Sequence, residues 1–227
     1  MSTEEVLAII PAYNEESTIA QVINSLREEG LSRIVVVDDG SSDSTATEAA
    51  RAGAKVLRHI MNRGPGAATQ TGLDYARRTS APCAVTIDAD YQHDPKDVEL
   101  LLDAVREDGA DMVIGNRFMK GTNYIPGSRV LYNALANVAT YLFSSHWVSD
   151  TQSGYKAFSR KAIERLRLSH DGFAFCSEII IKAQRARLRI AEVPIRVNYS
   201  PETIRKGQGL GTGVRTLANL VQGYILK

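Results

Sequence analysis

The chain has 227 residues, of which 44% are hydrophobic and 23% charged, and its formal net charge is +1. This composition is typical of one soluble, globular α/β domain with a sizeable core. No apolar run approaches the roughly 18 residues that a membrane-spanning helix needs, and Glu4 and Glu5 stand where a secretory signal would be basic. We therefore expect neither a membrane span nor a signal peptide. Cys83 and Cys176 lie in apolar stretches and are expected to be buried free thiols.

In the first half of the chain, short apolar runs alternate with segments of helical periodicity. Strands are expected near residues 6–10, 34–37, 55–57, 82–87 and 112–114. The helices between them end near residues 30, 52 and 78, and another begins at Asp94-Pro95, where an acid before proline is typical of a helix start. Repeated β-α units predict a mostly parallel sheet flanked by helices, with right-handed crossovers.

The pattern changes after Arg117. The second half predicts a long apolar helix over 128–147, a helix near 177–187, a strand over 190–197, a basic Gly-rich loop over 199–213 and a helix at about 214–226. Residues 182–227 contain nine Lys/Arg and two Asp/Glu, a net charge of +7, which leaves −6 for the rest of the chain. This basic part favours an anionic partner such as a membrane, a phosphorylated lipid or nucleic acid, with solvated helix faces as the alternative.

Two acids, Asp88 and Asp90, follow the apolar run 82–87 and are separated by Ala89. Side chains two positions apart on an extended chain share a face, so both carboxylates should meet at the carboxyl end of a strand, where open α/β sheets bind ligands. Adjacent carboxylates raise each other's pKa, and a hard divalent cation, Mg²⁺ or Mn²⁺, would relieve the repulsion. Because such an ion usually has substrate phosphates in its shell, the pair predicts a phosphorylated substrate. A merely solvated acid pair is the alternative.

Polar residues also follow two earlier strands. Residues 11–15 contain an aromatic and an acid, and residues 38–41 contain two adjacent acids. An aromatic ring and carboxylates at neighbouring strand ends favour a nucleobase and ribose site, with helix capping as the alternative for each motif alone. The G-x-G within 63–68 lacks the third glycine and the later acid of a dinucleotide fingerprint, so a dehydrogenase is disfavoured.

Two arginines come after the acid pair. Arg117 follows the strand 112–114, and Ser128-Arg129 open the next helix. A helix N-terminus with arginine is a good phosphate receptor, and surface salt bridges are the alternative. The arginines therefore favour a phosphate group close to the acid pair.

Six ordered motifs resemble those of the family-2 glycosyltransferases with a GT-A fold, especially the dolichyl- or polyprenyl-phosphate sugar synthases. They are IPAYNE (10–15), VDDGSSD (37–43), DADYQHDP (88–95), GNRF (115–118), DTQSGYK (150–156) and EVPI (192–195). The first two are shared across family 2, whereas the third and fifth narrow the resemblance to lipid-phosphate acceptors. The resemblance implies a single GT-A domain over 1–227, with a nucleotide-sugar half over about 1–117 and an acceptor- and membrane-facing half over about 118–227.

The resemblance also implies a role for each matching residue. The nucleotide would be bound by Pro11, Ala12, Tyr13, Glu15, Asp38, Asp39, Asp88 and Ala89. The metal, Mg²⁺ or Mn²⁺, would be bound by Asp88, Asp90 and Gln92. The acceptor phosphate would be received by Arg117, Arg129 and Ser153, and a loop with Arg205 and Lys206 would close over the diphosphate. The expected catalytic residues are Asp90, Arg117 and Arg129.

Two positions depart from the family pattern. Asn116 stands where the family usually has serine, and residues 205–209 read RKGQG in place of the usual Gly-x-Ser-Lys. Asn116 directly precedes Arg117, which is assigned to the acceptor phosphate, and residues 205–209 include the Arg205 and Lys206 assigned to the diphosphate loop.

The implied reaction is an inverting transfer in which a lipid monophosphate attacks the anomeric carbon of GDP-mannose, UDP-glucose or UDP-GlcNAc. A phosphate monoester is largely ionised at pH 7, so it needs little help from a general base. One alternative is a soluble family-2 transferase acting on a sugar hydroxyl, for which Asp150 would be the candidate base. Another is a non-catalytic nucleotide-sugar-binding module at a membrane.

The expected partners are thus a nucleotide-sugar donor, a polyprenyl or dolichyl phosphate and a membrane surface. The helices over 128–147 and 214–226 are candidates for membrane docking, with the core or a second subunit as the alternative destination. We expect a peripheral protein at the cytoplasmic face of the membrane, without a nucleic-acid partner. A homo-oligomer and a separate membrane-anchoring subunit are both compatible with this expectation.

Overall fold

The computed structural model describes residues 1–119, 121 and 123–199. Strands and helices alternate along most of this part of the chain. In chain order the elements are η1 (Thr3–Glu5), β1 (Leu7–Ala12), α1 (Ile19–Glu28), β2 (Arg33–Asp38), α2 (Thr45–Arg51), β3 (Lys55–Arg58), α3 (Pro65–Arg78), β4 (Cys83–Thr86), η2 (Pro95–Asp97), α4 (Val98–Arg106), β5 (Met112–Asn116), α5 (Gly127–Ser144), β6 (Lys156–Ser159), α6 (Arg160–Arg165), α7 (Phe175–Arg185) and β7 (Ile190–Pro194).

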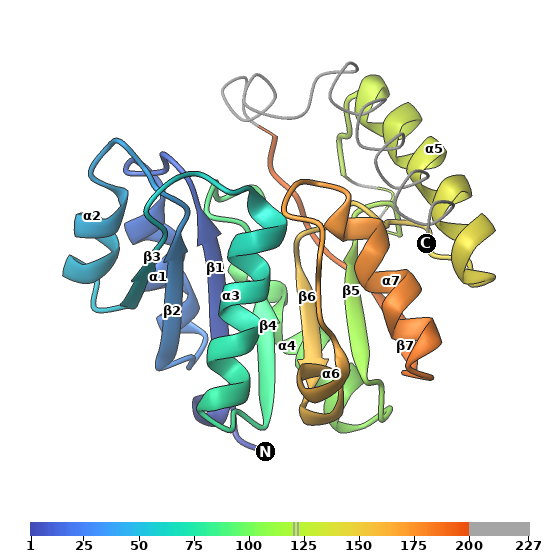
Figure 1. The fold of residues 1–227 in the computed structure, drawn as a ribbon, viewed down its shortest axis with the longest axis horizontal. Helices are drawn as coiled ribbons and strands as arrows, with labels where there is room; N and C mark the ends of the chain where they lie inside the picture. Colours follow the sequence, from blue (N-terminus) through green and yellow to red (C-terminus); the bar gives the residue numbers. More distant parts are fainter. Residues whose placement is uncertain (120, 122, 200–227) are drawn as a thin grey trace.

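These strands form one seven-stranded sheet in the order β3-β2-β1-β4-β6-β5-β7. All neighbouring strands run parallel except β6, which is antiparallel to both β4 and β5. The predicted mostly parallel sheet is therefore confirmed. The exception arises because α5 stays beyond the carboxyl edge of the sheet (Figure 1), so the chain re-enters the sheet from that edge.

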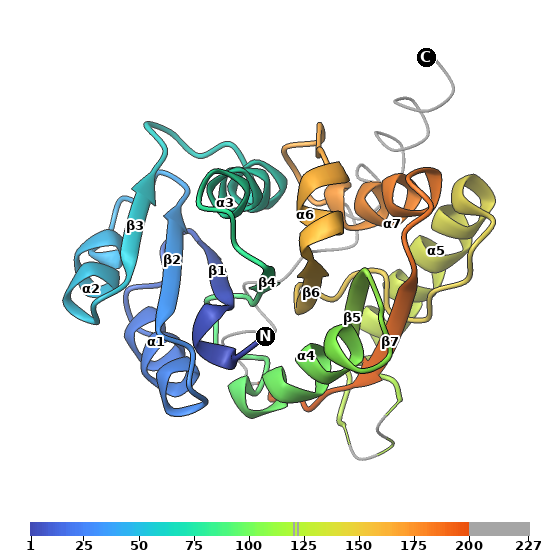
Figure 2. The ribbon, with the colours of Figure 1, turned by 90° about the horizontal axis from the view of Figure 1, so that it is seen from below.

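Helices cover both faces of the sheet, with α3, α6 and α7 on one face and α1 and α4 on the other (Figure 2). Strand β1 shows why the strands in the first half of the chain are apolar at successive positions. Ala8 and Ile10 belong to the core beneath α1 and α4, whereas Leu7 and Ile9 belong to the core beneath α3 and α7. A strand buried on both faces needs apolar residues at every position. Both cysteines are buried and free, as expected.

The carboxyl edge of the sheet collects the polar motifs. The ends of β1, β2 and β5 and the segment after β4 all lie at the upper edge in Figure 1. Helix α5 lies beyond this edge and packs against α7. The fold therefore places the motifs at 11–15, 38–41, 88–92 and 115–118 around one opening.

The Gly-rich segment at the start of α3 has a packing role. The amides of Gly66 and Ala67 donate to the carbonyl oxygen of Asp171, at 2.7 and 3.1 Å. A Cβ atom on Gly66 would lie 2.1 Å from the carbonyl oxygen of His170. Glycine at this position therefore allows the loop before α7 to lie against the first turn of α3.

Some predicted boundaries differ from the structure. Strand β7 ends at Pro194, and Val197 forms only an isolated bridge with His93. The helix predicted from Asp94-Pro95 begins as the short η2 turn before α4. The predicted helix over 214–226, and the loop before it from residue 200, lie outside the described residues. No helix in the described part of the chain is long and apolar enough to cross a bilayer.

Candidate active site at the carboxyl edge of the sheet

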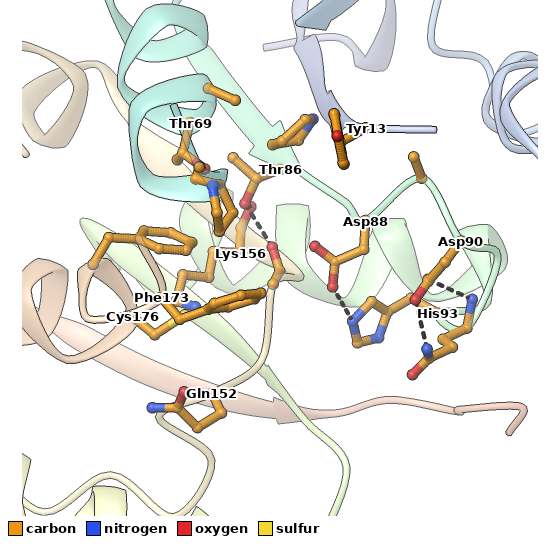
Figure 3. A pocket seen from close by; sticks show the side chains of 18 of the residues that line it. Tyr13, Thr69, Thr86, Asp88, Asp90, His93, Gln152, Lys156, Phe173 and Cys176 are labelled. Carbon is orange, nitrogen blue, oxygen red and sulfur yellow. Dashed lines mark hydrogen bonds and ion pairs between the residues drawn. The ribbon is translucent and has the colours of Figure 1, made fainter. Parts of the chain in front are cut away.

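A pocket of about 500 Å³ opens at the carboxyl edge of the sheet (Figure 3). The predicted site residues that line it are Pro11, Ala12, Tyr13, Glu15, Asp39, Asp88, Ala89, Asp90, Gln92, Arg117 and Arg129. Asp38 and Ser153 are not among the residues that line it. Arg205 and Lys206 lie outside the described residues. The fold thus brings together most of the residues that the sequence assigned to a donor and an acceptor.

The two acids at the end of β2 differ in their contacts. Asp38 is buried, accepts from the Ser41 amide at 3.0 Å and pairs with Arg58 at 3.0 Å, so it stabilises the turn. Asp39 lines the pocket, and its carboxylate also accepts from the amides of Arg63 (3.0 Å) and Gly64 (2.7 Å). The His59 Nδ1 atom lies 2.6 Å from the same carboxylate. Asp39 therefore fixes the loop that leads into α3 as well as facing the pocket.

The acid pair lies directly after β4. The Asp88 carboxylate is 3.2 Å from His93 Nε2, and the Asp90 carboxylate accepts from the side chain and amide of Gln92 at 2.5 and 3.1 Å (Figure 3). Burial and the neighbouring Asp88 raise the pKa of Asp90 to about 6. Burial opposes ionisation of Asp88, but the hydrogen bond from His93 holds the pKa of Asp88 below its ordinary value. A Cβ on Gly154 would lie 2.2 Å from an Asp88 carboxylate oxygen, so the glycine leaves room for it.

The donor set of this pair fits a hard divalent cation. In the part of the chain that the structure describes, no group of three or more His, Cys, Asp and Glu side chains is placed to hold a metal. Two carboxylates with remaining positions for water and substrate phosphates match the usual shell of Mg²⁺. A cation beside the pair would offset the burial and the charge of Asp88 that raise the pKa of Asp90.

Arg117 is held in a bidentate ion pair. Its Nε and Nη2 atoms donate to the Asp150 carboxylate at 2.8 and 2.6 Å, and Nη1 donates to the Tyr199 hydroxyl at 3.2 Å. Arg117 is almost fully buried and Asp150 is fully buried. Burial opposes the guanidinium charge, but Asp150 raises the pKa of Arg117 above its ordinary value. Asp150 is therefore the counterion of Arg117.

Glu192 on β7 supports this ion pair. Its carboxylate accepts from the amides of Ser149 and Asp150, both at 3.1 Å, and from Asn116 Nδ2 at 2.7 Å. Asn116 also donates to the Ser149 hydroxyl at 2.6 Å and accepts from the Phe118 amide at 2.7 Å. The asparagine that departs from the family pattern thus ties β5 to the turn that carries Asp150.

The three residues assigned to the acceptor phosphate are not all placed alike. Arg129, in the first turn of α5, lines the pocket, and its buried Nη2 atom has no hydrogen-bond partner among the described residues. The Ser153 hydroxyl is buried and accepts from the Tyr155 amide at 3.3 Å. Arg117 and Arg129 therefore reach the pocket, whereas Ser153 shapes the turn before β6.

The pocket also contains residues to which sequence reasoning gave no role. His93 lies within the motif 88–95 and Lys156 within the motif 150–156. The sequence did not predict that their side chains would face the pocket. Phe173, Phe175 and Cys176 come from the start of α7 and the loop before it. They gave no sequence signal, because their place depends on how α7 packs against α3 and α5.

Comparisons with known proteins agree with this geometry. The family model for glycosyl transferase family 2 matches residues 7–167. The chain is 32% identical to UDP-N-acetylglucosamine–dolichyl-phosphate N-acetylglucosaminyltransferase of Methanococcus voltae, with 97% of this chain and 96% of that protein covered. It is 33% identical to polyprenol monophosphomannose synthase of Mycolicibacterium smegmatis, with 85% and 77% covered.

A solved structure shares the fold. Glucosyl-3-phosphoglycerate synthase from Mycobacterium tuberculosis, in complex with Mn²⁺, uridine diphosphate and phosphoglyceric acid, superposes with a TM-score of 0.73. The superposition covers 96% of this chain and 77% of that chain at 23% identity. A family model that spans most of the chain, relatives above 30% identity and this structural likeness lead to one conclusion: the chain belongs to glycosyltransferase family 2 and has the GT-A fold.

Proposed function

We propose that this glycosyltransferase moves a sugar from a nucleotide-sugar donor to the phosphate of a dolichyl or polyprenyl phosphate, with inversion at the anomeric carbon. GDP-mannose, UDP-glucose and UDP-GlcNAc are the candidate donors. The names of the Methanococcus voltae and Mycolicibacterium smegmatis relatives, which include a dolichyl phosphate and a polyprenol monophosphate sugar, support this acceptor class.

The observation that carries the proposal is the charge at the acceptor side of the pocket, which we define by Arg117, Phe118, Ile125 and Arg129. Arg129 has an unused buried nitrogen, while the Asp150 carboxylate is occupied by Arg117. A hydroxyl acceptor needs a base to take its proton, whereas a phosphate monoester is already largely ionised at pH 7. Two cations, with the candidate base Asp150 held by Arg117, therefore favour a phosphate acceptor over a sugar hydroxyl.

The reaction then requires positioning more than proton transfer. A phosphate oxygen of the acceptor forms a bond to the anomeric carbon while the bond from that carbon to the diphosphate oxygen breaks, and its electron pair leaves with the nucleoside diphosphate. Arg129 and the remaining N–H groups of Arg117 would hold the acceptor phosphate for this attack. Asp39 and the exposed ring of Tyr13 would hold the nucleoside.

Asp88 and Asp90 would bind Mg²⁺ or Mn²⁺ together with the donor diphosphate, and Gln92 would orient Asp90. When bound, the cation offsets the charge that develops on the leaving diphosphate. The Mn²⁺ and uridine diphosphate in the mycobacterial neighbour support this assignment.

We further propose that α5 meets the lipid at a membrane surface. The helix that supplies Arg129 to the pocket exposes apolar side chains along its outer face: Val130, Leu131, Leu135, Val138, Tyr141 and Leu142. Arg129 is the one charged residue among residues 127–144. An apolar helix face beside a phosphate site would let the acceptor remain in the membrane while its head group enters the pocket.

A transfer assay tests the proposed reaction. Purified protein with Mg²⁺ or Mn²⁺ would be given labelled UDP- and GDP-sugars and a short polyprenyl phosphate, and label that moves into organic solvent would be counted. Transfer from one donor, lost in Asp90→Ala, is the expected result. Release of nucleoside diphosphate without lipid-linked label would keep the donor site and reject the acceptor. Nucleotide-sugar binding with neither product would favour a non-catalytic binding module.

A further inference from the structure

Lys156 is a cation buried in the wall of the pocket. It is the first residue of β6, only 1% of its surface is exposed, and it lines the pocket. Its Cα pairs with Thr86 on β4 and with Ile114 on β5. Lys156 therefore lies on β6, between β4, which leads to Asp88, and β5, which leads to Arg117.

Lys156 forms no direct ion pair among the described residues. Its ammonium donates to the carbonyl of Ser153, and no described Asp or Glu forms an ion pair with it. Asp88 is near enough for Lys156 to lower the pKa of its carboxyl, yet the Asp88 carboxylate is hydrogen bonded to His93. An ammonium has three N–H donors, and burying it with one hydrogen-bond acceptor and no contacting anion costs free energy. An anion bound in the pocket at this point would offset that cost.

The position of Lys156 favours the acceptor over the leaving diphosphate. Burial raises the pKa of the Cys176 thiol, which Lys156 is near enough to lower, and Figure 3 shows Lys156 on the side of Asp88 away from Asp90. An inverting attack needs the acceptor on the face of the sugar opposite the diphosphate, and the diphosphate is assigned to the acid pair. Lys156 and Arg117 are both near enough to Asp88 to lower its pKa, so an anion at Lys156 would lie on the acceptor side of the pocket.

We propose that Lys156 contacts the substrate, binding the acceptor phosphate as a third cation beside Arg117 and Arg129; this rests on the proposed phosphate acceptor. The charges match. Asp150 offsets the charge of Arg117, whereas Arg129 and Lys156 form no ion pair with any residue that the structure describes. A phosphate monoester carries about −1.5 to −2 at pH 7.

The test compares Lys156→Met, which keeps the length of the side chain without its charge, with Lys156→Arg, which keeps the charge. The matched control is Lys161→Met on α6, because Lys161 is half-exposed and pairs with Asp111 at 2.8 Å. We expect Lys156→Met to raise the KM for polyprenyl phosphate about 10- to 100-fold, the effect of losing a charged hydrogen bond. Donor affinity should stay unchanged, Lys156→Arg should restore most of the loss, and the control should behave as wild type.

Thermal unfolding separates substrate binding from a structural role. Without ligands, Lys156→Met should have a Tm equal to or above that of wild type, because a buried charge without a contacting anion is removed. The rise in Tm that inorganic phosphate gives in the presence of nucleoside diphosphate and Mg²⁺ should disappear. A lower Tm with an unchanged acceptor KM would overturn the proposal in favour of a structural role. An equal loss of donor affinity would overturn it in favour of the diphosphate.

Failure of the proposed function has a different signature. If the wild type transfers sugar to polyprenyl phosphate and Lys156→Met does so equally well, Lys156 is wrongly assigned and the function stands. If the wild type transfers only to a small phosphate acceptor such as phosphoglycerate, the lipid assignment falls. The effect of Lys156→Met on the KM for that acceptor then decides the assignment of Lys156.

Discussion

Asp90 is an acid whose charged form the fold disfavours. Burial and the adjacent Asp88 raise its pKa to about 6, so the folded protein holds a proton there that the unfolded chain releases near its ordinary pKa of 3.8. The ionised carboxylate therefore destabilises the fold, and this destabilisation is fully present above pH 6 and absent below the unfolded pKa. A cation that binds the ionised pair must compete with the proton.

We expect the metal-dependent affinity for nucleoside diphosphate to be highest above pH 6 and to fall about tenfold per pH unit below it, since one proton is displaced. Without ligands at pH 7, Asp90→Asn should raise Tm by about 2–4 °C, equivalent to roughly 1 kcal/mol for a domain of this size. Thermal unfolding with and without Mg²⁺ and nucleoside diphosphate measures both effects. An affinity that stays flat from pH 7 to pH 5 would contradict the metal assignment.

Glu178 on α7 is the opposite case, a buried carboxylate that the fold satisfies. It accepts from the amides of Ser169 and His170, both at 2.9 Å, and pairs with Lys182 at 2.7 Å. Burial opposes ionisation, but the hydrogen bonds from Lys182 and Ser169 lower the pKa of Glu178 to about 2. These contacts hold the loop whose Asp171 carbonyl receives the first amides of α3. One acid thus joins α7 to the helix beside the donor site.

Glu178→Gln should lower the free energy of unfolding by about 2 kcal/mol at pH 7, because the amide cannot accept from all of these donors. The folded pKa is depressed, so this stabilisation is complete above the ordinary pKa of 4.5 and is lost as the pH falls towards 2. Urea unfolding between pH 7 and about pH 3 should therefore show the gap between wild type and variant narrowing in acid. Glu164→Gln, whose exposed partner is Arg160, is the control. A gap that does not depend on pH would show that lost packing dominates.

At the scale of elements, the turn between α5 and β6 has contacts that the sequence did not predict. The motif 150–156 was recognised in the sequence, and its last residue, Lys156, begins β6. Its internal contacts were not predictable, because they depend on β7, far away in the chain. Ser153 and Asp38 illustrate the same point. A motif tells which residues lie next to a strand, but neighbouring elements decide whether a side chain faces the pocket.

Asp150→Asn tests the role of this turn. The substitution keeps the shape of the side chain but leaves the Arg117 guanidinium buried without its counterion, so we expect a loss of about 3 kcal/mol in the free energy of unfolding. Asn at this position should also displace Arg117 and weaken acceptor binding while nucleotide binding persists. If Asp150 were instead the base for a hydroxyl acceptor, turnover would be lost while acceptor binding stayed unchanged. Unfolding and binding measured on one preparation distinguish the two roles.

For the whole molecule, the sequence predicted the α/β architecture, the motifs at one edge and the long helix over 128–147. Strand and helix periodicity carry that information directly. The direction of β6 and the closing of the pocket by α7 could not be predicted, because both depend on α5 remaining beyond the sheet edge. The exposure of α5 is likewise a property of the assembled fold, and it leaves an apolar face beside the pocket.

If this face docks on a membrane, charges placed on it should release the protein. We expect Leu135→Glu with Leu142→Glu to reduce co-sedimentation with liposomes about tenfold or more, since each buried leucine contributes roughly 1.5–3 kcal/mol of transfer free energy. Leu100→Glu on α4 is the control, because Leu100 is 41% exposed and belongs to a helix on the sheet face opposite α7. Sugar transfer to a detergent-dispersed acceptor should survive in all variants.

The competing destination for this face is a second copy of the chain. Light scattering of the same variants separates the two, since a dimer interface would dissociate while liposome binding persisted. Loss of liposome binding with an unchanged oligomeric state supports docking, because it ties the exposed face of α5 to the lipid phase from which the acceptor phosphate must enter the pocket.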